Sequence, residues 1–290
     1  QVVKDNPNFL ISPYAVEMVL AFVRSGCKGE AAREIRHCFH LGDNDTIKSF
    51  AEEWLSVLEE NDKYTLHMAN KLYVKTNFQI NEGFKRAATE KFKSDVENID
   101  FVPKTKAADT MNGWVERQTN KKIKNLISSD IFDETTRAMI INALYFKGNW
   151  STQRKGLRSL EDQIEDVIKH RYFREAYVDV DLPKFKIENT LNLKGTLRNL
   201  GISKAFDGKD VDLSGIAGKE GDLIVSDVVQ KTFISVEEGG VETNASTCRR
   251  FTRKLVEPRF GYFIADHPFI FYIRANDVII FIGRVSAPSH

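Results

Sequence analysis

The chain has 290 residues, of which 42% are hydrophobic and 29% charged, the balance of a soluble globular protein with a sizeable core. Its formal net charge of +1 provides no global field to attract nucleic acid or a membrane surface. No apolar run reaches the roughly 18 residues of a membrane span. The first residues carry no cleavable signal pattern and read as the start of a trimmed or mature chain.

Cysteine and histidine patterns give no support for a metal site or an enzyme. Three cysteines, Cys27, Cys38 and Cys248, cannot all pair, and no CxxC spacing suggests zinc. We expect free thiols, with a Cys27–Cys38 disulfide as the alternative that geometry decides. The histidines lack metal-ligand spacing. The GxSxG, GxGxxG, GxxxxGK[ST] and HExxH motifs are absent, so we expect neither catalysis nor a bound cofactor.

The sequence of the N-terminal half predicts mainly helices. Ser12 followed by Pro13 is a helix start, because serine caps the first turn and proline is tolerated there, and Gly26 ends the run. The periodicity predicts further helices and one strand. The helices are expected over Glu30–Phe39, Ser49–Leu58, Asn81–Phe92 and Thr110–Thr119, and the strand over Leu66–Val74.

The C-terminal half predicts mainly strands. Met139–Phe146 is a nearly continuous apolar run, typical of a strand buried on both faces, and its single Asn142 must find a buried partner. Tyr177–Ile187 alternates as a strand, although Pro183 favours an edge or bulge. Because helices and strands do not alternate regularly, we predict an α+β fold. The other elements are helices over Leu157–Lys169 and Leu193–Leu200 and strands over Lys231–Val236, Phe260–Ile264, Phe269–Arg274 and Val278–Ile282.

Residues 237–255 form an unusual segment. From Glu237 to Thr247 the side chains are small, acidic or hydroxylic. Four of the six residues 249–254 are Arg or Lys. The simplest interpretation is a long surface loop between strands. Loops of this length are usually functional or disordered, and an exposed basic loop is a natural cleavage site for a trypsin-like protease.

Several motifs resemble those of the serpin family. Phe263–Ile273 resembles the family's C-terminal signature, and Gly240–Thr247 resembles its hinge. The similarity covers essentially the whole chain. Further matching stretches are Asn8–Pro13, Ala69–Tyr73, Trp114–Glu116, Asn142–Trp150, Leu182–Phe185 and Phe281–Val285. The resemblance implies one domain over residues 1–290, with about nine helices around three β-sheets and an exposed reactive-centre loop.

The resemblance also implies a function as a suicide-substrate inhibitor, not an enzyme, whose partner is a trypsin-like serine protease. Counting from hinge and signature places the reactive bond at Lys254–Leu255, flanked by Arg250 and Arg253. Arg253–Lys254 and Arg250–Phe251 are alternative bonds. After cleavage the hinge inserts into the family's sheet A. The implied hinge residues are Gly240, Val241, Glu242, Thr243, Asn244, Ala245, Ser246 and Thr247.

The resemblance implies a cluster that controls the opening of sheet A. Ser12 and Asn142 match the family's shutter pair, and Trp150 matches the tryptophan at the top of the sheet. Gln230 replaces the usual histidine. Since an amide both donates and accepts, we expect a modified hydrogen-bond network there.

One departure from the family is large. The stretches that end at about Gln153 and begin at about Arg154 are separated in serpins by roughly fifty to sixty residues, far beyond ordinary loop variation. We therefore expect a segment of the natural chain to be absent from this sequence, along with the N-terminal part of helix A. A non-inhibitory serpin, a carrier or chaperone, is the alternative, favoured by the gap and by the larger Thr243 and Asn244 in the hinge.

The remaining expectations concern setting and modification. We expect a secreted, monomeric glycoprotein that regulates an immune or other proteolytic cascade and has no nucleic-acid or membrane partner. Sequons occur at Asn44, Asn149 and Asn244, and we expect Asn244 to carry no glycan because one there would impede insertion. A glycosaminoglycan such as heparin could bind basic residues. The two candidate groups are Lys121, Lys122 and Lys124, and Lys169, Arg171 and Arg174.

Overall fold

The structure is a computed structural model that describes residues 8–38, 64–148, 178–207, 211–236, 261–275 and 278–286. The helices are α1 (Pro13–Arg24), α2 (Gly29–Cys38), α4 (Glu82–Phe92), α5 (Lys104–Gln118) and α7 (Lys194–Asn199), with a short 3-10 helix η1 (Ser129–Ile131). The strands are β1 (Phe9–Ile11), β2 (Tyr64–Lys75), β3 (Asp95–Ile99), β4 (Ala138–Gly148), β5 (Val178–Asp181), β6 (Phe185–Asn192), β7 (Asp227–Val236), β8 (Gly261–Ile264), β9 (Phe269–Ala275) and β10 (Val278–Val285).

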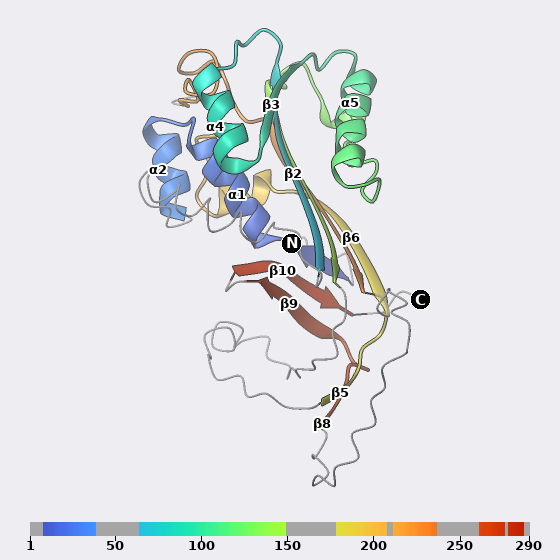
Figure 1. The fold of residues 1–290 in the computed structure, drawn as a ribbon. Helices are drawn as coiled ribbons and strands as arrows, with labels where there is room; N and C mark the ends of the chain where they lie inside the picture. The colour runs from blue at the N-terminus through green and yellow to red at the C-terminus, as the bar shows by residue number, and fades with distance from the viewer. Residues whose placement is uncertain are drawn as a thin grey trace.

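The described strands form three sheets, which together with the helices give the expected α+β fold. The central sheet has five strands in the order β3-β2-β4-β7-β6. A three-stranded sheet has the order β1-β10-β9, and β5 pairs with β8 in a two-stranded sheet. In Figure 1 the central sheet is seen nearly edge-on, with α5 on one side and α1, α2 and α4 on the other. We call the α5 side the front face and the opposite side the rear face.

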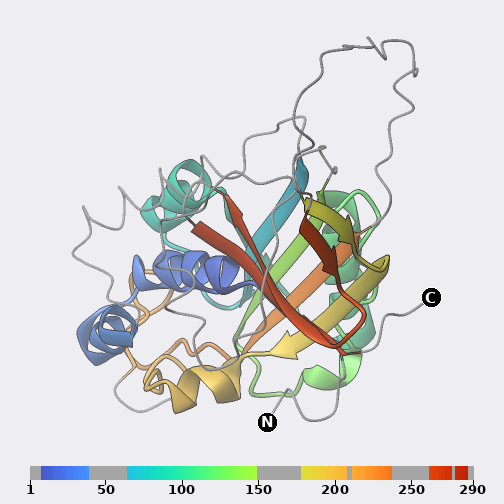
Figure 2. The same cartoon turned by 90° about the horizontal axis from the view of Figure 1, so that it is seen from below.

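Two hydrophobic cores lie on these two faces. The larger core joins α1, α2 and α4 to the rear of the central sheet and to β10, with Phe22 stacked on Phe84 at 5.1 Å between ring centroids. In Figure 2 the red strands β9 and β10 cross in front of the central strands. The smaller core joins α5 to the front of β2, β4 and β7. Because β4 contributes to both cores, it is buried on both faces, as its continuous apolar sequence predicts.

The first helix begins as its sequence predicts. Ser12 is the N-cap of α1, its hydroxyl accepts a hydrogen bond from the amide of Ala15 at 3.2 Å, and Pro13 occupies the first turn. Most of the helix is buried against the rear of the sheet. The cap therefore fixes the point at which the chain leaves β1 and enters the larger core.

Four expectations need correction. α5 begins at Lys104 and not at Thr110, because its first turns bury only the small Ala107 and Ala108 and so give a weak apolar pattern. The expected strand 177–187 is broken by Pro183 into β5 and β6, which join different sheets. β7 begins at Asp227, four residues before the expected start. β3 was not predicted, because its burial follows no simple alternation.

Other expectations have mixed outcomes. Cys27 and Cys38 are free thiols, and burial raises the pKa of the Cys27 thiol to about 12, which suits an inert core residue. Cys248 and the helices expected at 49–58 and 157–169 lie outside the described residues. Within the described ranges, no helix is long and apolar enough to cross a membrane and no group of residues could hold a metal ion.

Candidate functional site

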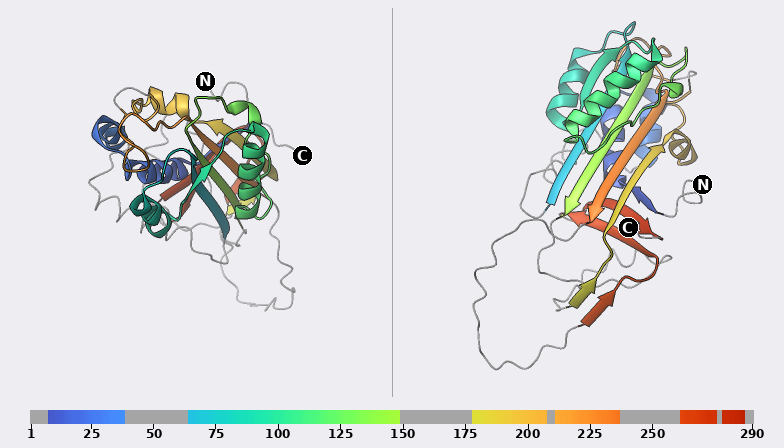
Figure 3. Two further views of the ribbon diagram at one scale, coloured as in Figure 1. Left: turned by 90° about the horizontal axis from the view of Figure 1, so that it is seen from above. Right: turned by 90° about the vertical axis from the view of Figure 1, so that its right-hand side faces the viewer.

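The centre of the sheet is a seam between two parallel strands. β4 and β7 pair in parallel without interruption, from Met139 opposite Asp227 to Lys147 opposite Ser235. The right-hand view of Figure 3 shows both strands running side by side to the same end of the sheet. At that end β7 leads directly into residues 237–260, which carry the predicted hinge and bait. A chain that turned back from β7 into this seam would run antiparallel to both neighbours.

A ladder of buried amides closes the rear of the seam. Asn70 on β2, Asn142 on β4 and Gln230 on β7 stand side by side in register and are at most 2% exposed. The Nδ2 of Asn142 donates to the Oδ1 of Asn70, and the Nε2 of Gln230 donates to the Oδ1 of Asn142 at 2.9 Å. The last of these bonds crosses the seam. An inserted strand would have to break it.

Ser12 connects this ladder to the N-terminal helix. Its backbone amide donates to the Oε1 of Gln230 and its carbonyl accepts from the Nε2 of Gln230, both at 3.3 Å. Its hydroxyl donates to the carbonyl of Ile280 on β10 at 2.6 Å. The structure therefore brings together Ser12, Asn142 and Gln230. Gln230 uses both ends of its amide in this network, because its Oε1 accepts and its Nε2 donates.

Two further polar residues anchor the β6–β7 half of the sheet to β1. The amide of Leu10 donates to the Oδ1 of Asn189 at 2.7 Å, and the hydroxyl of Thr232 donates to the carbonyl of Leu10 at 3.1 Å. Asn70, Asn189 and Thr232 were not singled out from the sequence. The available signal was the alternation along each strand: two residues to either side, Asn70 has Met68 and Leu72, and Asn189 has Ile187 and Leu191. A polar residue on such an apolar face needs a buried partner, whereas Thr232 carries no equally clear signal.

The front of the seam is closed by a different set of contacts. The Nζ of Lys231 on β7 lies 2.6 Å from the Oε1 of Glu188 and donates at 2.6 Å to the carbonyl of Lys124, in the segment after α5. The rings of Tyr145 and Phe233 stack across the seam at 5.5 Å between centroids. The aromatic stack therefore joins β4 to β7 at the front of the seam, while the Lys231 contacts hold β7 to β6 and to the segment after α5. The rear closure depends on neutral amides.

The other predicted site residues divide into two groups. Lys121, Lys122 and Lys124 are exposed in the turn that follows α5, and Lys121 has a left-handed backbone with φ of 62°. The rest lie outside the described residues. They are the hinge Gly240–Thr247, the bait residues Arg250, Arg253, Lys254 and Leu255, the tryptophan Trp150, the basic residues Lys169, Arg171 and Arg174, and the sequon residues Asn44, Asn149 and Asn244.

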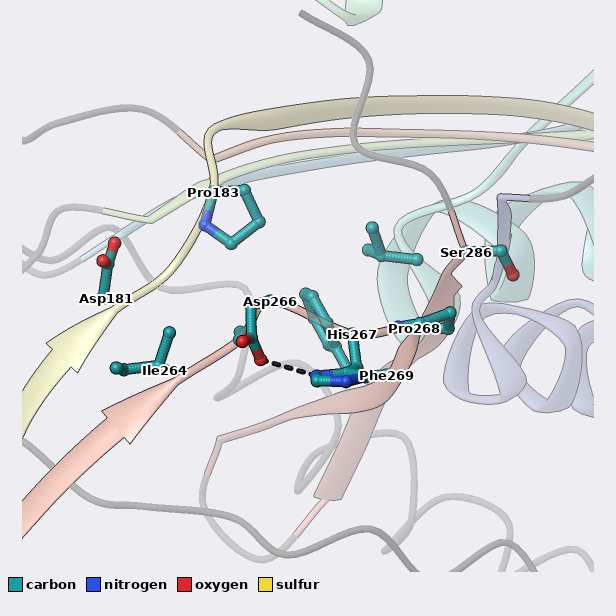
Figure 4. A pocket seen from close by; sticks show the side chains of 10 residues that line it. Asp181, Pro183, Ile264, Asp266, His267, Pro268, Phe269 and Ser286 are labelled. Atoms are coloured by element: carbon teal, nitrogen blue, oxygen red, sulfur yellow. Dashed lines mark hydrogen bonds and ion pairs between the residues drawn. The ribbon is translucent and has the colours of Figure 1, made fainter.

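A hollow of about 290 Å³ lies where β5 ends and the chain turns from β8 into β9 (Figure 4). Its lining includes the Asp266–His267–Pro268–Phe269 part of the predicted C-terminal signature. His267 Nδ1 lies 2.6 Å from Asp266 Oδ1, and this hydrogen bond is the main reason that the pKa of Asp266 is below its usual range. Both side chains are exposed, so the pair lies at the surface of this turn.

Comparison with known proteins agrees with this architecture. The family model "Serpin (serine protease inhibitor)" matches residues 1–157 and 152–288. Leukocyte elastase inhibitor of Homo sapiens is 27% identical over 361 aligned positions, covering 98% of this chain and 95% of the relative. Serine protease inhibitor 42Dd of Drosophila melanogaster is 29% identical over 348 positions, covering 98% and 92%.

Comparison with solved structures also finds serpins. Serpin48 of the insect Tenebrio molitor, described as a highly specific serpin, is 37% identical, with a TM-score of 0.82 over 98% of this chain and 93% of that chain. Uncleaved ovalbumin is 22% identical with a TM-score of 0.82, covering 99% and 95%, which shows the shared fold alone. The family match, the relatives and the three-sheet architecture lead to one conclusion: the chain belongs to the serpin family.

Proposed function

We propose that this serpin is a suicide-substrate inhibitor of trypsin-like serine proteases, cleaved at Lys254–Leu255 and then closed by insertion of its hinge between β4 and β7. The observation that carries the proposal is the central seam. β4 and β7 are parallel neighbours over their whole length, and β7 continues into the small-residue hinge. A strand that turned back from the end of β7 would lie between β4 and β7 and could form main-chain hydrogen bonds with both.

The energetics favour insertion once the loop is cut. Exchanging one parallel ladder for two antiparallel ladders adds main-chain hydrogen bonds and buries alternate hinge side chains. Residues that become buried in this way must be small and uncharged, and Val241, Thr243, Ala245 and Thr247 alternate along the hinge with that character. While the loop is uncut, its far end remains joined to β8, which opposes full insertion, so the uncut protein would be kinetically trapped.

The protease class is assigned from the bait residues of this chain. Relatives carry names that refer to different proteases, such as leukocyte elastase inhibitor, Antichymotrypsin-2 and Antitrypsin, so the family alone does not name the target. A lysine before the scissile bond suits a protease with an acidic primary pocket. Arg253–Lys254 and Arg250–Phe251 would be read by the same class of enzyme.

The test is to mix the protein with trypsin and separate the products on a denaturing gel. The proposal predicts a covalent band at the summed mass of the acyl-enzyme, and a released peptide whose first residue is Leu255. Lys254→Ala is the variant that should slow complex formation with trypsin strongly. Lys219→Ala should not, because Lys219 is exposed in the turn before β7, at the opposite end of that strand from the loop. A released peptide that begins elsewhere would move the reactive bond.

A non-inhibitory serpin is the second candidate. The hinge residues Thr243 and Asn244 are larger and more polar than the alanines that ease insertion, which would slow closure and let the acyl-enzyme hydrolyse. Clean cleavage of the loop without a covalent band would favour this candidate, a carrier or chaperone with the same fold.

We also propose that the natural chain contains an internal segment that this sequence lacks, near residues 153–154. The family model matches in two stretches that meet at residues 152–157, and the alignment with leukocyte elastase inhibitor spans 361 positions against the 290 residues of this chain. Full-length sequencing of the transcript tests this proposal. A continuous message with no additional codons at this point would contradict it.

We further propose that the protein is a secreted, glycosylated monomer that acts in a proteolytic cascade. Lys121, Lys122 and Lys124 are exposed in one turn and could bind a sulfated glycosaminoglycan. Heparin should then accelerate inhibition of trypsin, and the acceleration should disappear in the triple alanine variant. If heparin accelerated inhibition equally in the wild-type protein and the variant, these lysines would not be the heparin site.

A further inference from the structure

The strand that follows the bait loop carries two exposed large apolar side chains. On β8, Tyr262 is 77% exposed and Ile264 59%, and residues two apart along a strand lie on the same face. Among the described residues, only Val102 and Leu200 are large hydrophobic residues of similar exposure, and they belong to two other segments. Single exposed apolar residues are common on protein surfaces, whereas two neighbours on one face indicate a surface that a partner covers.

The neighbouring strand places an acidic residue beside this apolar pair. β5 and β8 pair in parallel, with Asp181 opposite Ile264. Since residues in register on adjacent strands project from the same face, the side chains of Asp181 and Ile264 lie together. Asp181 is itself exposed. We call the surface formed by Tyr262, Ile264 and Asp181 the β8 face.

The hollow of about 290 Å³ continues the β8 face toward the turn that leads into β9 (Figure 4). Ile264 and Asp181 belong to its lining, and Pro183, Phe269 and Val285 contribute apolar surface. A volume at the small end of the range for bound metabolites and drugs suits one side chain of a partner protein better than a whole small molecule.

The charge at the hollow selects the kind of side chain. Asp266 also lines it, and the hydrogen bond with His267 is the main reason that the pKa of Asp266 lies below its usual range, so this carboxylate is ionised at neutral pH. A carboxylate has more acceptor sites than this one bond uses. Two carboxylates at an apolar hollow fit a lysine or arginine side chain, whose hydrocarbon stem packs on the apolar groups while its charged head meets the carboxylates.

The β8 face lies within reach of an enzyme bound to the bait loop. Tyr262 is eight residues after Lys254, so even a fully extended chain separates their Cα atoms by no more than about 29 Å. A globular protease of roughly 200 residues has a radius of gyration of about 16 Å and is therefore about 40 Å across. The residues after the scissile bond leave the enzyme's cleft on the side that leads to β8. An enzyme seated on Lys254–Leu255 therefore comes against the β8 face.

We propose that the β8 face is a second docking site for the target protease, beside the active-site cleft of that enzyme. Tyr262 and Ile264 pack on an apolar part of the enzyme surface, and the hollow lined by Asp181 and Asp266 receives a lysine or arginine side chain of the enzyme. The inference rests on the proposed function and deepens it, because it names a feature of the protease that the bait sequence does not select. This docking raises the rate at which the loop is attacked and leaves the later insertion step unchanged.

The first test uses the double variant Tyr262→Ser, Ile264→Ser, mixed with trypsin. The second-order rate constant of attack is measured from the disappearance of intact protein, so that covalent complex and cleaved loop are both counted. We expect this rate constant to fall several-fold. The unfolding temperature and the number of inhibitor molecules consumed per trypsin should remain those of the wild-type protein, because the substituted side chains are exposed and act before cleavage.

The matched control is the double variant Val102→Ser, Leu200→Ser. It removes two similarly exposed apolar side chains outside the β5–β8 sheet and should leave the rate constant of attack unchanged. The proposal is overturned if Tyr262→Ser, Ile264→Ser is attacked as fast as the wild-type protein, or if the control slows the attack equally.

The second test removes the charge at the hollow. For Asp181→Asn, Asp266→Asn we expect a several-fold lower rate constant of attack at low salt, and the difference from the wild-type protein should shrink as added salt screens the attraction. Glu134→Gln, Glu220→Gln is the matched control, since both glutamates are exposed in other turns and the charge change is the same. An equal fall in both variants would show a general effect of net charge and would overturn the role of the hollow.

These measurements separate the docking site from the proposed function. If trypsin cleaves the loop without a covalent complex, the inhibitory function fails, and slower cleavage of Tyr262→Ser, Ile264→Ser still supports the docking site. If the covalent complex forms at the same rate in variant and wild-type protein, the docking site alone is wrong. A wild-type dimer in sedimentation that the variant converts to a monomer would assign the β8 face to a second copy of the chain and overturn the proposal.

Discussion

The two faces of the β4–β7 seam are closed by different chemistry. On the rear face, neutral amides of Asn70, Asn142 and Gln230 are fully buried and bonded to one another. On the front face, the stacked rings of Tyr145 and Phe233 cross the seam, and the Lys231–Glu188 ion pair lies beside it, between β7 and β6. The rear closure is costly to break because its groups reach no water. The front closure is easier to release because separating two rings leaves no buried polar group without a partner.

The largest expected effect comes from placing a charge in the rear ladder. In Gln230→Glu the ionised carboxylate could not donate to Asn142 or to the Ser12 carbonyl, and burial would raise its folded-state pKa. Because this carboxyl has a higher pKa in the folded state than in the unfolded state, it costs no stability below the unfolded pKa of about 4.3. The folded state loses stability as the pH rises above that value. We expect the variant to resemble the wild-type protein near pH 4 and to lose several kcal/mol by pH 8.

Guanidinium unfolding of both proteins across this pH range is the measurement. The wild-type curve supplies the intrinsic pH dependence, which is subtracted. A loss that is the same at every pH would mean that residue 230 is not as deeply enclosed as the structure shows.

Asn142→Leu should have the next largest effect. It removes the bond across the seam, leaves the Oδ1 of Asn70 without a donor, and should destabilise the native form by about 2–4 kcal/mol. The first unfolding transition in guanidinium measures the loss. Asn192→Ala is the control, since Asn192 is exposed and its Nδ2 donates to Asp227 at 2.7 Å, so its loss should cost no more than about 0.5 kcal/mol. Equal losses of native stability in the two variants would contradict the claim that the buried amides matter more than a surface amide.

Lys231→Met should have the smallest effect and sharpens the contrast between the faces. It removes the bond to the Lys124 carbonyl and leaves Glu188 in a position where water already reaches it. We expect the native stability to change by no more than about 1 kcal/mol, measured in the same guanidinium titration. A loss as large as that of Asn142→Leu would show that both faces are held equally firmly.

Much of the fold could be predicted from the sequence because the strongest patterns are local. The Ser12–Pro13 start of α1 and the apolar run of β4 each contain their own signal, and both are confirmed. The break at Pro183 was visible, but its consequence, two strands in two different sheets, depends on tertiary pairing. The first half of α5 was missed because it buries alanines, which give little periodicity.

The site was predictable in part for a similar reason. Ser12, Asn142 and Gln230 were identified from the family resemblance, and the structure places them in contact. The β8 face was not identified, because Tyr262 and Ile264 belong to an apolar strand and look like buried residues. Their exposure becomes visible only in the structure, where β5 supplies Asp181 beside Ile264.

The central claim, that the seam between β4 and β7 receives the cut loop, is tested most directly by thermal unfolding before and after cleavage. The loop is cut with a protease that does not form a covalent complex, and the melting of intact and cleaved protein is compared by circular dichroism. The account predicts that the cleaved protein melts at a much higher temperature, because the inserted strand completes the central sheet. A cleaved protein that melts at the same or a lower temperature would contradict it.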